Sequence, residues 1–300
     1  MFKPFLSSLT ALAIISLGAC QAESTPPQIM PSELDGWPSL ERRLICLPPT
    51  ASLVAAHRGT TKGKGLSENS LESLRVHYEA GIRVAEIDVA QLASGEHILF
   101  HDGVWEDKST GQGVVASSRW REVEGYLLRD TEGGFTTDRP PLLTDIFLYA
   151  RGRLHLEIDF KSSADYAEVI DLIRDYNMEE DVILISYSVG QARKLARLAP
   201  EMLISIGVKN PSDIKRHEEV GVAQDKMMAW VGGNENAGLL RFLKSADVPI
   251  LSRKQGQQKR SPDIYVTDHA LKSRPFEGVI GLNKNERASY ELCLIKTNRN

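Results

Sequence analysis

Short apolar runs alternate with amphipathic stretches along most of the chain. The apolar runs indicate β-strands at 53–56, 84–89, 98–100, 154–160, 182–187, 202–208, 227–231, 249–252 and 264–267. Apolar residues spaced three and four apart indicate helices at 71–80, 166–176, 190–198 and 237–244. This alternation predicts parallel pairing, and roughly eight strands predict an α/β fold, a somewhat irregular (β/α)8 TIM barrel. Run 98–100 is one strand too many, so we expect at least one run to extend the rim or to belong to an insertion.

Two stretches interrupt the regular alternation. The stretch from about 103 to 153 has few long apolar runs and many Gly, Ser, Thr and charged residues, which indicates a small insertion over the barrel rim. The link 252–264 is polar and has no apolar stripe, so we expect no full helix there.

The strand near 154–161 divides into an apolar face and a polar face, because alternate strand residues point to opposite sides. The apolar face can pack beneath helices and consists of Leu154, Leu156, Ile158 and Phe160. The polar face would point into the barrel and consists of His155, Glu157, Asp159 and Lys161. Active sites of such barrels lie at the C-terminal strand ends, so this pattern puts Asp159 and Lys161 at the chemical end.

Two histidines and a pair of carboxylates lie on or directly after three of the predicted strands. His57 follows 53–56, His101 follows 98–100, and Glu86 and Asp88 lie on 84–89. At a rise of about 3.3 Å per residue, both carboxylates can face one cation from the same side of the strand. The pattern predicts a metal site flanked by two proton carriers.

The arrangement resembles the glycerophosphodiester phosphodiesterase family, whose members carry His-Arg-Gly, Glu-Asn, Glu-x-Asp and His-Asp in this order. The matching elements are His57-Arg58-Gly59, Glu68-Asn69, Glu86-Ile87-Asp88 and His101-Asp102. The resemblance continues through 107–113 and 141–145 and covers roughly residues 51–270. A single short motif has a high false-positive rate, whereas four in order are specific.

The resemblance implies a metal-dependent phosphodiesterase that hydrolyses glycerophosphodiesters to glycerol phosphate and an alcohol. One divalent cation, Ca²⁺ or Mg²⁺, would be held by Glu86, Asp88 and a third carboxylate. Asp159-Phe160-Lys161 matches the family pattern at this strand end, so we favour Asp159 as the third ligand over Glu157, one alternation deeper.

The remaining roles also come from the resemblance. Arg58 and Lys161 would hold phosphate oxygens, and Glu68 would contact the substrate. His57 and His101 would be the general base and the general acid, although the sequence does not exclude the reverse. The glycerol hydroxyl would attack first and give a cyclic phosphate, which water then opens.

Two parts of the sequence depart from the family pattern. Asp145 replaces a usual glutamate, and Ser252-Arg253-Lys254 stands where many relatives have a tryptophan-bearing segment. The extra positive charge would suit a more anionic head group or would simply be solvated. The preferred head group is therefore not assigned from the sequence.

The first residues resemble a bacterial lipoprotein signal. A positive start precedes an apolar run, 5–17, that is too short to span a bilayer and ends in Leu17-Gly18-Ala19-Cys20. This resemblance implies a signal peptide that ends at Cys20, which becomes the first mature residue and carries the lipid, and anchoring to the cell envelope, on the periplasmic side of the outer membrane. An ordinary secretory peptide is the alternative. Residues 21–49 are rich in Pro and Ser, which predicts a semi-rigid tether before a catalytic domain at 50–300.

Length and composition fit one barrel domain. The chain has 300 residues with 42% hydrophobic content, and such barrels typically need about 250 residues. A formal net charge of −4 with scattered basic residues argues against nucleic-acid binding, and no obligatory protein partner is evident. Export would allow a disulfide between Cys46 and Cys293, with two separate buried thiols as the alternative.

Two other functions remain open at this stage. A phospholipase C- or D-like enzyme with the same barrel and histidine pair would act on lysolipid or phospholipid head groups. A non-catalytic lipoprotein would use the barrel only as a binding surface, but an intact set of His57, His101, Glu86 and Asp88 argues against it.

Overall fold

Eight parallel strands close into a barrel in the computed structural model, which describes residues 36–60, 65–232, 236–253, 262–269, 271 and 274–295. The barrel strands run in the order β1-β9-β8-β7-β6-β5-β4-β2, and pairing of β1 with β2 completes the circle. Their bounds are β1 Ser52–Ala56, β2 Val84–Gln91, β4 His155–Phe160, β5 Val182–Ser186, β6 Leu203–Gly207, β7 Met227–Trp230, β8 Ile250–Ser252 and β9 Ile264–Thr267. The predicted (β/α)8 barrel is therefore confirmed.

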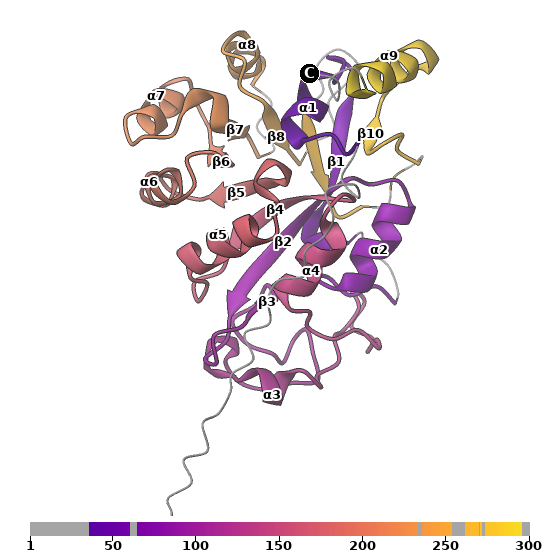
Figure 1. Ribbon diagram of the computed structural model, residues 1–300, viewed down its shortest axis with the longest axis vertical. Helices are drawn as coiled ribbons and strands as arrows, with labels where there is room; N and C mark the ends of the chain where they lie inside the picture. The colour runs from indigo at the N-terminus through magenta and orange to yellow at the C-terminus, as the bar shows by residue number, and fades with distance from the viewer. Residues whose placement is uncertain are drawn as a thin grey trace, which may run out of the picture.

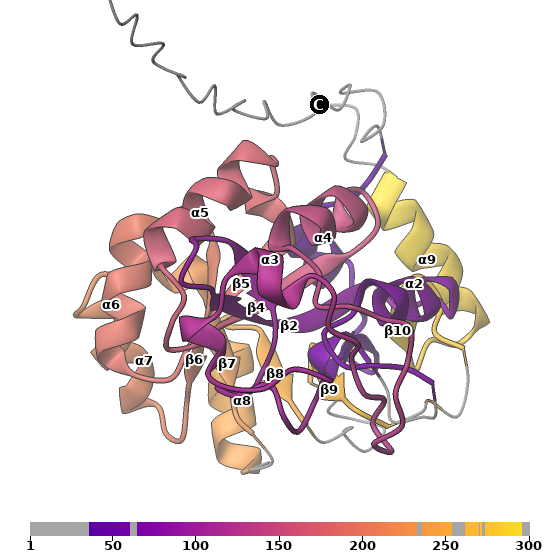
Figure 2. The same ribbon diagram turned by 90° about the horizontal axis from the view of Figure 1, so that it is seen from below.

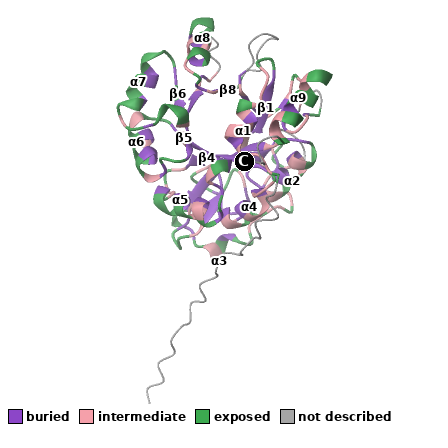
Figure 3. Cartoon of the chain, turned by 45° about the horizontal axis from the view of Figure 1, so that its top comes forward, coloured by how far each residue is buried: buried purple, intermediate pink, exposed green. Residues whose placement is uncertain are grey.

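Helices surround the strands (Figure 1). Their bounds are α1 Leu40–Ile45, α2 Leu71–Glu79, α3 Trp120–Val123, α4 Leu143–Ala150, α5 Tyr166–Asp175, α6 Val189–Leu198, α7 Ser212–Glu218, α8 Ala237–Ser245 and α9 Lys284–Ile295. Figure 3 shows buried residues on the strands and on the inner sides of the helices, and exposed residues on the outer sides. The four helices expected from periodicity correspond to α2, α5, α6 and α8.

Two short strands lie outside the barrel circle. The run expected at 98–100 forms β3, His97–Leu99, which pairs antiparallel with β2 and so extends the rim. Strand β10, Val279–Ile280, pairs antiparallel with β1 and was not predicted. The surplus ninth run is thus explained, because β3 belongs to a hairpin rather than to the parallel circle.

The main hydrophobic core lies between the strands and the helices. The predicted apolar face of β4 takes part in it, since Leu156 and Ile158 are fully buried and belong to one cluster with residues of α4, α5 and α6. Burying such side chains stabilises the fold by about 1.5–3 kcal/mol each. The polar face of the same strand is left for the barrel interior.

The segment before β1 closes the N-terminal end of the barrel. Helix α1 buries Leu40 and Arg43, and Arg43 Nε donates a hydrogen bond to His155 Nε2 at 2.8 Å. The Trp37 ring stacks on the His155 ring with centroids 4.9 Å apart. The predicted tether over 21–49 is therefore wrong for residues 36–49. Prolines in this segment do not prevent one short helix, because the apolar and aromatic side chains have a surface to pack on.

The predicted insertion over 103–153 is too long at its C-terminal end. Residues 143–150 form α4, whose Leu143, Ile146 and Phe147 are buried in the main core. The preceding part folds over the rim around a small core that includes Trp105 and Leu128. Figure 2 shows this part, with α3, in front of the strands.

Other expectations for the ends of the chain have different outcomes. Cys46 and Cys293 form a disulfide with their Cα atoms 5.7 Å apart, which links α1 to α9. Cys20, the apolar run at 5–17 and residues 254–261 of the polar link lie outside the described residues. Among the described helices, none is long and apolar enough to cross a bilayer.

Candidate active site

The predicted site residues meet at the C-terminal ends of β1, β2 and β4. Strands β2 and β4 are in parallel register, with Glu86 opposite Glu157 and Asp88 opposite Asp159. Because alternate residues point inward, these four carboxyl groups share the barrel interior. Asp88 and Asp159 lie at the upper, C-terminal level, where the sequence placed them.

Three of these carboxylates form a candidate metal centre. Glu86, Asp88 and Asp159 each offer an oxygen within 4.8 Å of the other two, and the residues are only 5%, 1% and 5% exposed. Burial, reinforced by the charge of Asp88, raises the pKa of Glu86 well above its ordinary value. Buried like charges at this distance require positive charge, and three hard oxygen ligands suit Ca²⁺ or Mg²⁺. The donor set therefore fits the predicted cation.

Glu157 lies outside this carboxylate group. It is 3% exposed, and burial raises its pKa to about 8, with a further increase from the charge of Asp159. Its Oε2 has no hydrogen-bond partner among the described atoms. In the strand register Glu157 lies opposite Glu86 and one alternation below Asp159, so it is deeper in the barrel. The structure groups Asp159, not Glu157, with Glu86 and Asp88.

Nearby polar groups hold two of the carboxylates in place. Lys161 Nζ lies 2.5 Å from Asp88 Oδ1 and 2.8 Å from Asp159 Oδ2. The Asn69 side chain donates to Asp88 Oδ2 at 2.7 Å and accepts from the Asp88 backbone N–H at 3.0 Å. The Tyr187 hydroxyl donates to Asp159 Oδ2 at 2.8 Å. These contacts fix the orientation of the carboxylates before any substrate binds.

Arg58 occupies the centre of the site through an uncommon backbone conformation. Its φ of 55° is left-handed, and its backbone N–H donates to Glu86 Oε2 at 2.6 Å. Its guanidinium lies 3.0 Å from Glu68 Oε1 and 2.8 Å from His101 Nε2. Gly59 follows at φ +67°, where an added Cβ would be 2.9 Å from Leu74 Cδ2. The His-Arg-Gly motif thus needs its glycine for this turn.

The two histidines contact the carboxylate group in different ways, and His57 does so directly. His57 Nε2 is 3.9 Å from Glu86 Oε2 and accepts from Arg253 Nη2 at 3.0 Å, because a guanidinium can only donate. Burial, then the charges of Arg253 and Arg58, lower the pKa of His57 to about 4. His57 is therefore neutral at pH 7, which leaves it able to accept a proton.

His101 has a different environment. Its Nε2 accepts from Arg58, so its proton resides on Nδ1 and is donated to Asp102 Oδ1 at 2.6 Å. A carboxylate at Nδ1 orients the ring and stabilises the imidazolium form. Asp102 thus fixes the His101 ring with Nε2 toward Arg58.

The insertion completes one side of the site. Lys108 Nζ lies 3.4 Å from Glu68 Oε2, and Lys108, Leu128 and Arg129 form a small hollow with His101. Glu68 is consequently held between Arg58 and Lys108, which supports its predicted place at the substrate site.

Sequence reasoning missed Tyr187 and left Arg253 unassigned. Both follow the C-terminal end of a barrel strand, β5 and β8 respectively, so the rule used for the histidines could have found them. The other histidines whose contacts the structure describes have structural roles. Asp145, which replaces the family glutamate, lies in the first turn of α4.

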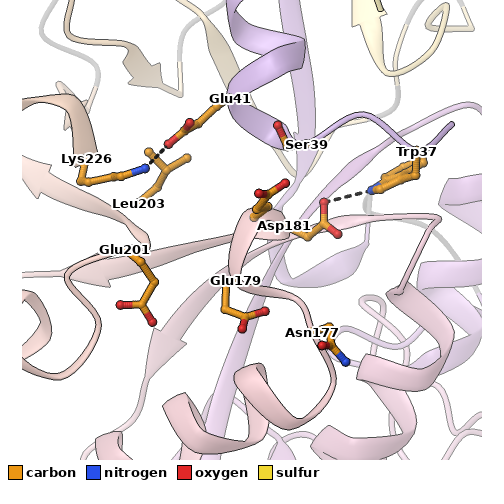
Figure 4. Close-up of a pocket in the computed structure, with 10 residues that line it drawn as sticks. Trp37, Ser39, Glu41, Asn177, Glu179, Asp181, Glu201, Leu203 and Lys226 are labelled. Atoms are coloured by element: carbon orange, nitrogen blue, oxygen red, sulfur yellow. Dashed lines mark hydrogen bonds and ion pairs between the residues drawn. The ribbon is translucent and has the colours of Figure 1, made fainter. Parts of the chain in front are cut away.

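A larger pocket lies at the opposite end of the barrel, near α1 (Figure 4). It has a volume of about 630 Å³ and is lined by acidic side chains, including Glu179, Asp181 and Glu201. Lys226 pairs with Glu41 at 2.5 Å across it, and Trp37 donates to Asp181 at 2.9 Å. Size alone would favour this pocket, but the carboxylate group and the histidines are at the other end. We therefore assign the chemistry to the C-terminal side.

Comparisons with known proteins agree with this assignment. A sequence profile described as "Glycerophosphoryl diester phosphodiesterase family" matches residues 57–235. A curated glycerophosphodiester phosphodiesterase from Caldanaerobacter subterraneus is 27% identical over 162 residues, which are 52% of this chain and 66% of the relative. The chain thus spans about two thirds of the length of this curated relative.

Solved structures share the fold. A glycerophosphoryl diester phosphodiesterase from Parabacteroides distasonis has a TM-score of 0.68 and 22% identity, covering 80% of this chain and 96% of its own. A phosphodiesterase from Oleispira antarctica, solved with the product sn-glycerol-3-phosphate, has a TM-score of 0.61 and 18% identity, covering 76% and 95%. At these identities the likeness concerns the barrel fold.

Proposed function

The chain belongs to the glycerophosphoryl diester phosphodiesterase family, and from this premise we propose that it hydrolyses glycerophosphodiesters to glycerol phosphate and an alcohol. One observation carries the proposal. Three buried carboxylates lie within 4.8 Å of one another, His57 lies 3.9 Å from Glu86, and His101 contacts Arg58, which in turn lies 3.8 Å from Asp88. Family membership alone would not select catalysis over binding, whereas an intact acid, base and cation-binding set supports it. The product found in the Oleispira phosphodiesterase is consistent with this substrate class.

The divalent cation would be held by Glu86, Asp88 and Asp159 and would neutralise negative charge on the phosphate. Arg58 and Lys161 bring further positive charge to the same place. In the absence of substrate these two side chains pair with Asp88, and a phosphate would provide an alternative partner. A phosphodiester repels nucleophiles, so this concentration of positive charge lowers the barrier for attack at phosphorus.

We assign His57 as the base and His101 as the acid of the first step. Neutral His57 would take the proton from the attacking glycerol hydroxyl, and protonated His101 would give its proton to the leaving alkoxide. The expected product is a cyclic glycerol phosphate plus the free alcohol. In the second step His101 would deprotonate water and His57 would protonate the released hydroxyl. The low pKa of His57 and the Asp102 partner of His101 support this direction.

The test is a turnover assay on glycerophosphocholine, glycerophosphoethanolamine and glycerophosphoinositol with added Ca²⁺ or Mg²⁺. Release of glycerol phosphate, its loss with a chelator and its recovery with the cation are expected. Binding of these compounds without any turnover, at any added divalent cation, would instead indicate a non-catalytic protein.

A second candidate function has one observation in its favour. The rim insertion exposes Val104, Val114 and Phe135 at 41%, 51% and 55%. Apolar side chains beside an active site can contact a lipid surface, which would suit a phospholipase acting on lysolipid or phospholipid head groups. Faster turnover of lysolipid in vesicles than of soluble glycerophosphodiesters would favour this candidate.

For location, we propose lipid anchoring through Cys20 to the cell envelope, on the periplasmic side of the outer membrane. The motif Leu17-Gly18-Ala19-Cys20 after an apolar run supports it. A Cys46–Cys293 disulfide is also consistent with an oxidising compartment.

A further inference from the structure

Arg253 is a cation at the active site to which the proposed chemistry assigns no contact with the substrate. It follows β8, its side chain is exposed, and its guanidinium contacts His57 Nε2 at 3.0 Å. Among the described carboxylates none forms an ion pair with it. An exposed guanidinium without a carboxylate partner, next to a site that handles anions, is available for a further anion.

Arg253 also lies near a second pocket, which shares one residue with the contacts of the metal centre. Its guanidinium carbon lies 6.0 Å from the centre of the Trp230 ring, and Trp230 lines a pocket of about 360 Å³. Tyr187 lines the same pocket, while its hydroxyl contacts the metal-centre residue Asp159. Tyr187, directly after β5, therefore connects this pocket to Asp159, and Trp230, at the end of β7, connects it to Arg253. A substituent of a phosphate bound at the metal centre could extend into this pocket.

The charges around this pocket favour an anion. Lys209 and Arg216 line it, and Asp213 is the acidic residue among its described lining. Asp213 is already engaged, since it pairs with Arg216 at 3.1 Å and accepts from the Lys209 and Asn210 backbone N–H groups. Lys209 is exposed and forms no ion pair with a described carboxylate. Arg253 and Lys209 therefore contribute positive charge that no described carboxylate compensates with an ion pair.

We propose that this pocket binds the head group of the substrate and selects a head group that carries its own anionic group, a phosphate or a carboxylate. The inference rests on the proposed glycerophosphodiesterase function and names its substrate class. The same charges disfavour a cationic head group such as choline, because like charges are brought together when it binds. The aromatic walls, Tyr187 and Trp230, would pack against the carbon skeleton of the alcohol.

A simpler role for Arg253 makes a different prediction. If Arg253 only held the central phosphate, as Arg58 and Lys161 are placed to do, its removal would slow all glycerophosphodiesters by the same factor. If it reads the head group, its removal changes the ratio between substrates. The ratio of kcat/KM values also cancels any effect of Arg253 on His57, because the chemical step is common to both substrates.

The experiment compares two matched substrate pairs. Glycerophosphoinositol 4-phosphate differs from glycerophosphoinositol by one phosphate, and glycerophosphoserine differs from glycerophosphoethanolamine by one carboxylate. We expect the parent protein to favour the anionic member of at least one pair roughly tenfold in kcat/KM, the scale of one charge-assisted hydrogen bond. The pair that shows the preference identifies the anionic group.

The variants then locate the preference. For the preferred pair, the ratio to be compared is kcat/KM of the member with the extra anionic group divided by kcat/KM of the other member. Arg253→Gln and Lys209→Gln should each lower this ratio several-fold, and Arg253→Lys should retain part of the preference. Lys226→Gln is the control, since it removes one positive charge at the opposite end of the barrel and should leave the ratio unchanged. Ratios near one in the parent, or an unchanged ratio in Arg253→Gln, would overturn the inference while leaving the proposed function intact. Absence of turnover on every glycerophosphodiester would instead overturn the proposed function and the inference with it.

Discussion

Replacing Asp159 by Asn should weaken cation binding sharply, whereas Glu157→Gln should change it little. The carboxylate oxygens of Glu86, Asp88 and Asp159 lie within 4.8 Å of one another. At an effective dielectric constant of about 20, two unit charges at that distance repel by roughly 3.5 kcal/mol. The protein tolerates this repulsion because a cation, or in its absence Lys161 and Arg58, neutralises the group.

The expected loss of affinity is smaller than the gross Coulomb attraction of the removed charge. Asp159→Asn loses one ligand charge but also relieves two of the three repulsions, and solvent screens both effects. Groups behind the ligands usually change metal affinity 10–100-fold, so a direct ligand should cost at least about 100-fold, or roughly 2.7 kcal/mol. Glu157 lies one alternation deeper on β4 and outside the three-carboxylate group, so glutamine at this position removes no ligand. We expect the cation affinity of Glu157→Gln to stay within about threefold of that of the parent.

Isothermal titration of Ca²⁺ and of Mg²⁺ at pH 7 into the parent and both variants measures these differences. Far-ultraviolet circular dichroism controls for folding. Unchanged binding by Asp159→Asn together with loss in Glu157→Gln would move the third ligand to Glu157 and refute the reasoning.

Three further predictions concern the fold and its attachment. The disulfide joins residues separated by 247 positions. In the chain-entropy estimate, its removal by the double substitution Cys46→Ser and Cys293→Ser should lower the free energy of unfolding by up to about 5 kcal/mol. Identical urea midpoints for parent and variant would contradict this. Cys20→Ser should abolish incorporation of labelled fatty acid in a bacterial host and release the protein from the membrane fraction, whereas retained label would point to another anchor. Gly59→Ala should destabilise the fold by about 1–3 kcal/mol, because φ is +67° and the new Cβ would meet Leu74; a melting temperature equal to that of the parent would show that the turn adapts.

Periodicity was sufficient to predict the barrel but not its ends. Strand β4 is buried along its whole length and β2 at all but its last residue, and their apolar residues stand out at alternate positions in the sequence. Helix α1 and strand β10 are short and have no periodic signal of their own. Their structure depends on partners distant in the chain, as when Arg43 of α1 binds His155 of β4.

The ligand side chains were predictable because they lie on strands, where alternation fixes direction. Tyr187 and Arg253 follow strand ends, and only the closed barrel brings them to Asp159 and His57. The boundary of the insertion was wrong for the opposite reason. Residues 143–150 are apolar on most sides and show no clear polar face, yet they form a helix that packs into the core.

The most direct test of the two-histidine account varies the leaving group. His57→Ala and His101→Ala are compared on glycerophosphocholine, whose alcohol is a poor leaving group, and on the glycerol phosphodiester of 4-nitrophenol, which leaves without a proton. A general acid or base contributes about 10²–10⁴-fold, so both variants should lose at least about a hundredfold on glycerophosphocholine. On the nitrophenyl diester, measured as the first-step release of nitrophenol, His101→Ala should regain most of its rate and His57→Ala should remain slow. Equal losses on both substrates, or rescue of His57→Ala instead, would contradict the assignment of His57 as base and His101 as acid.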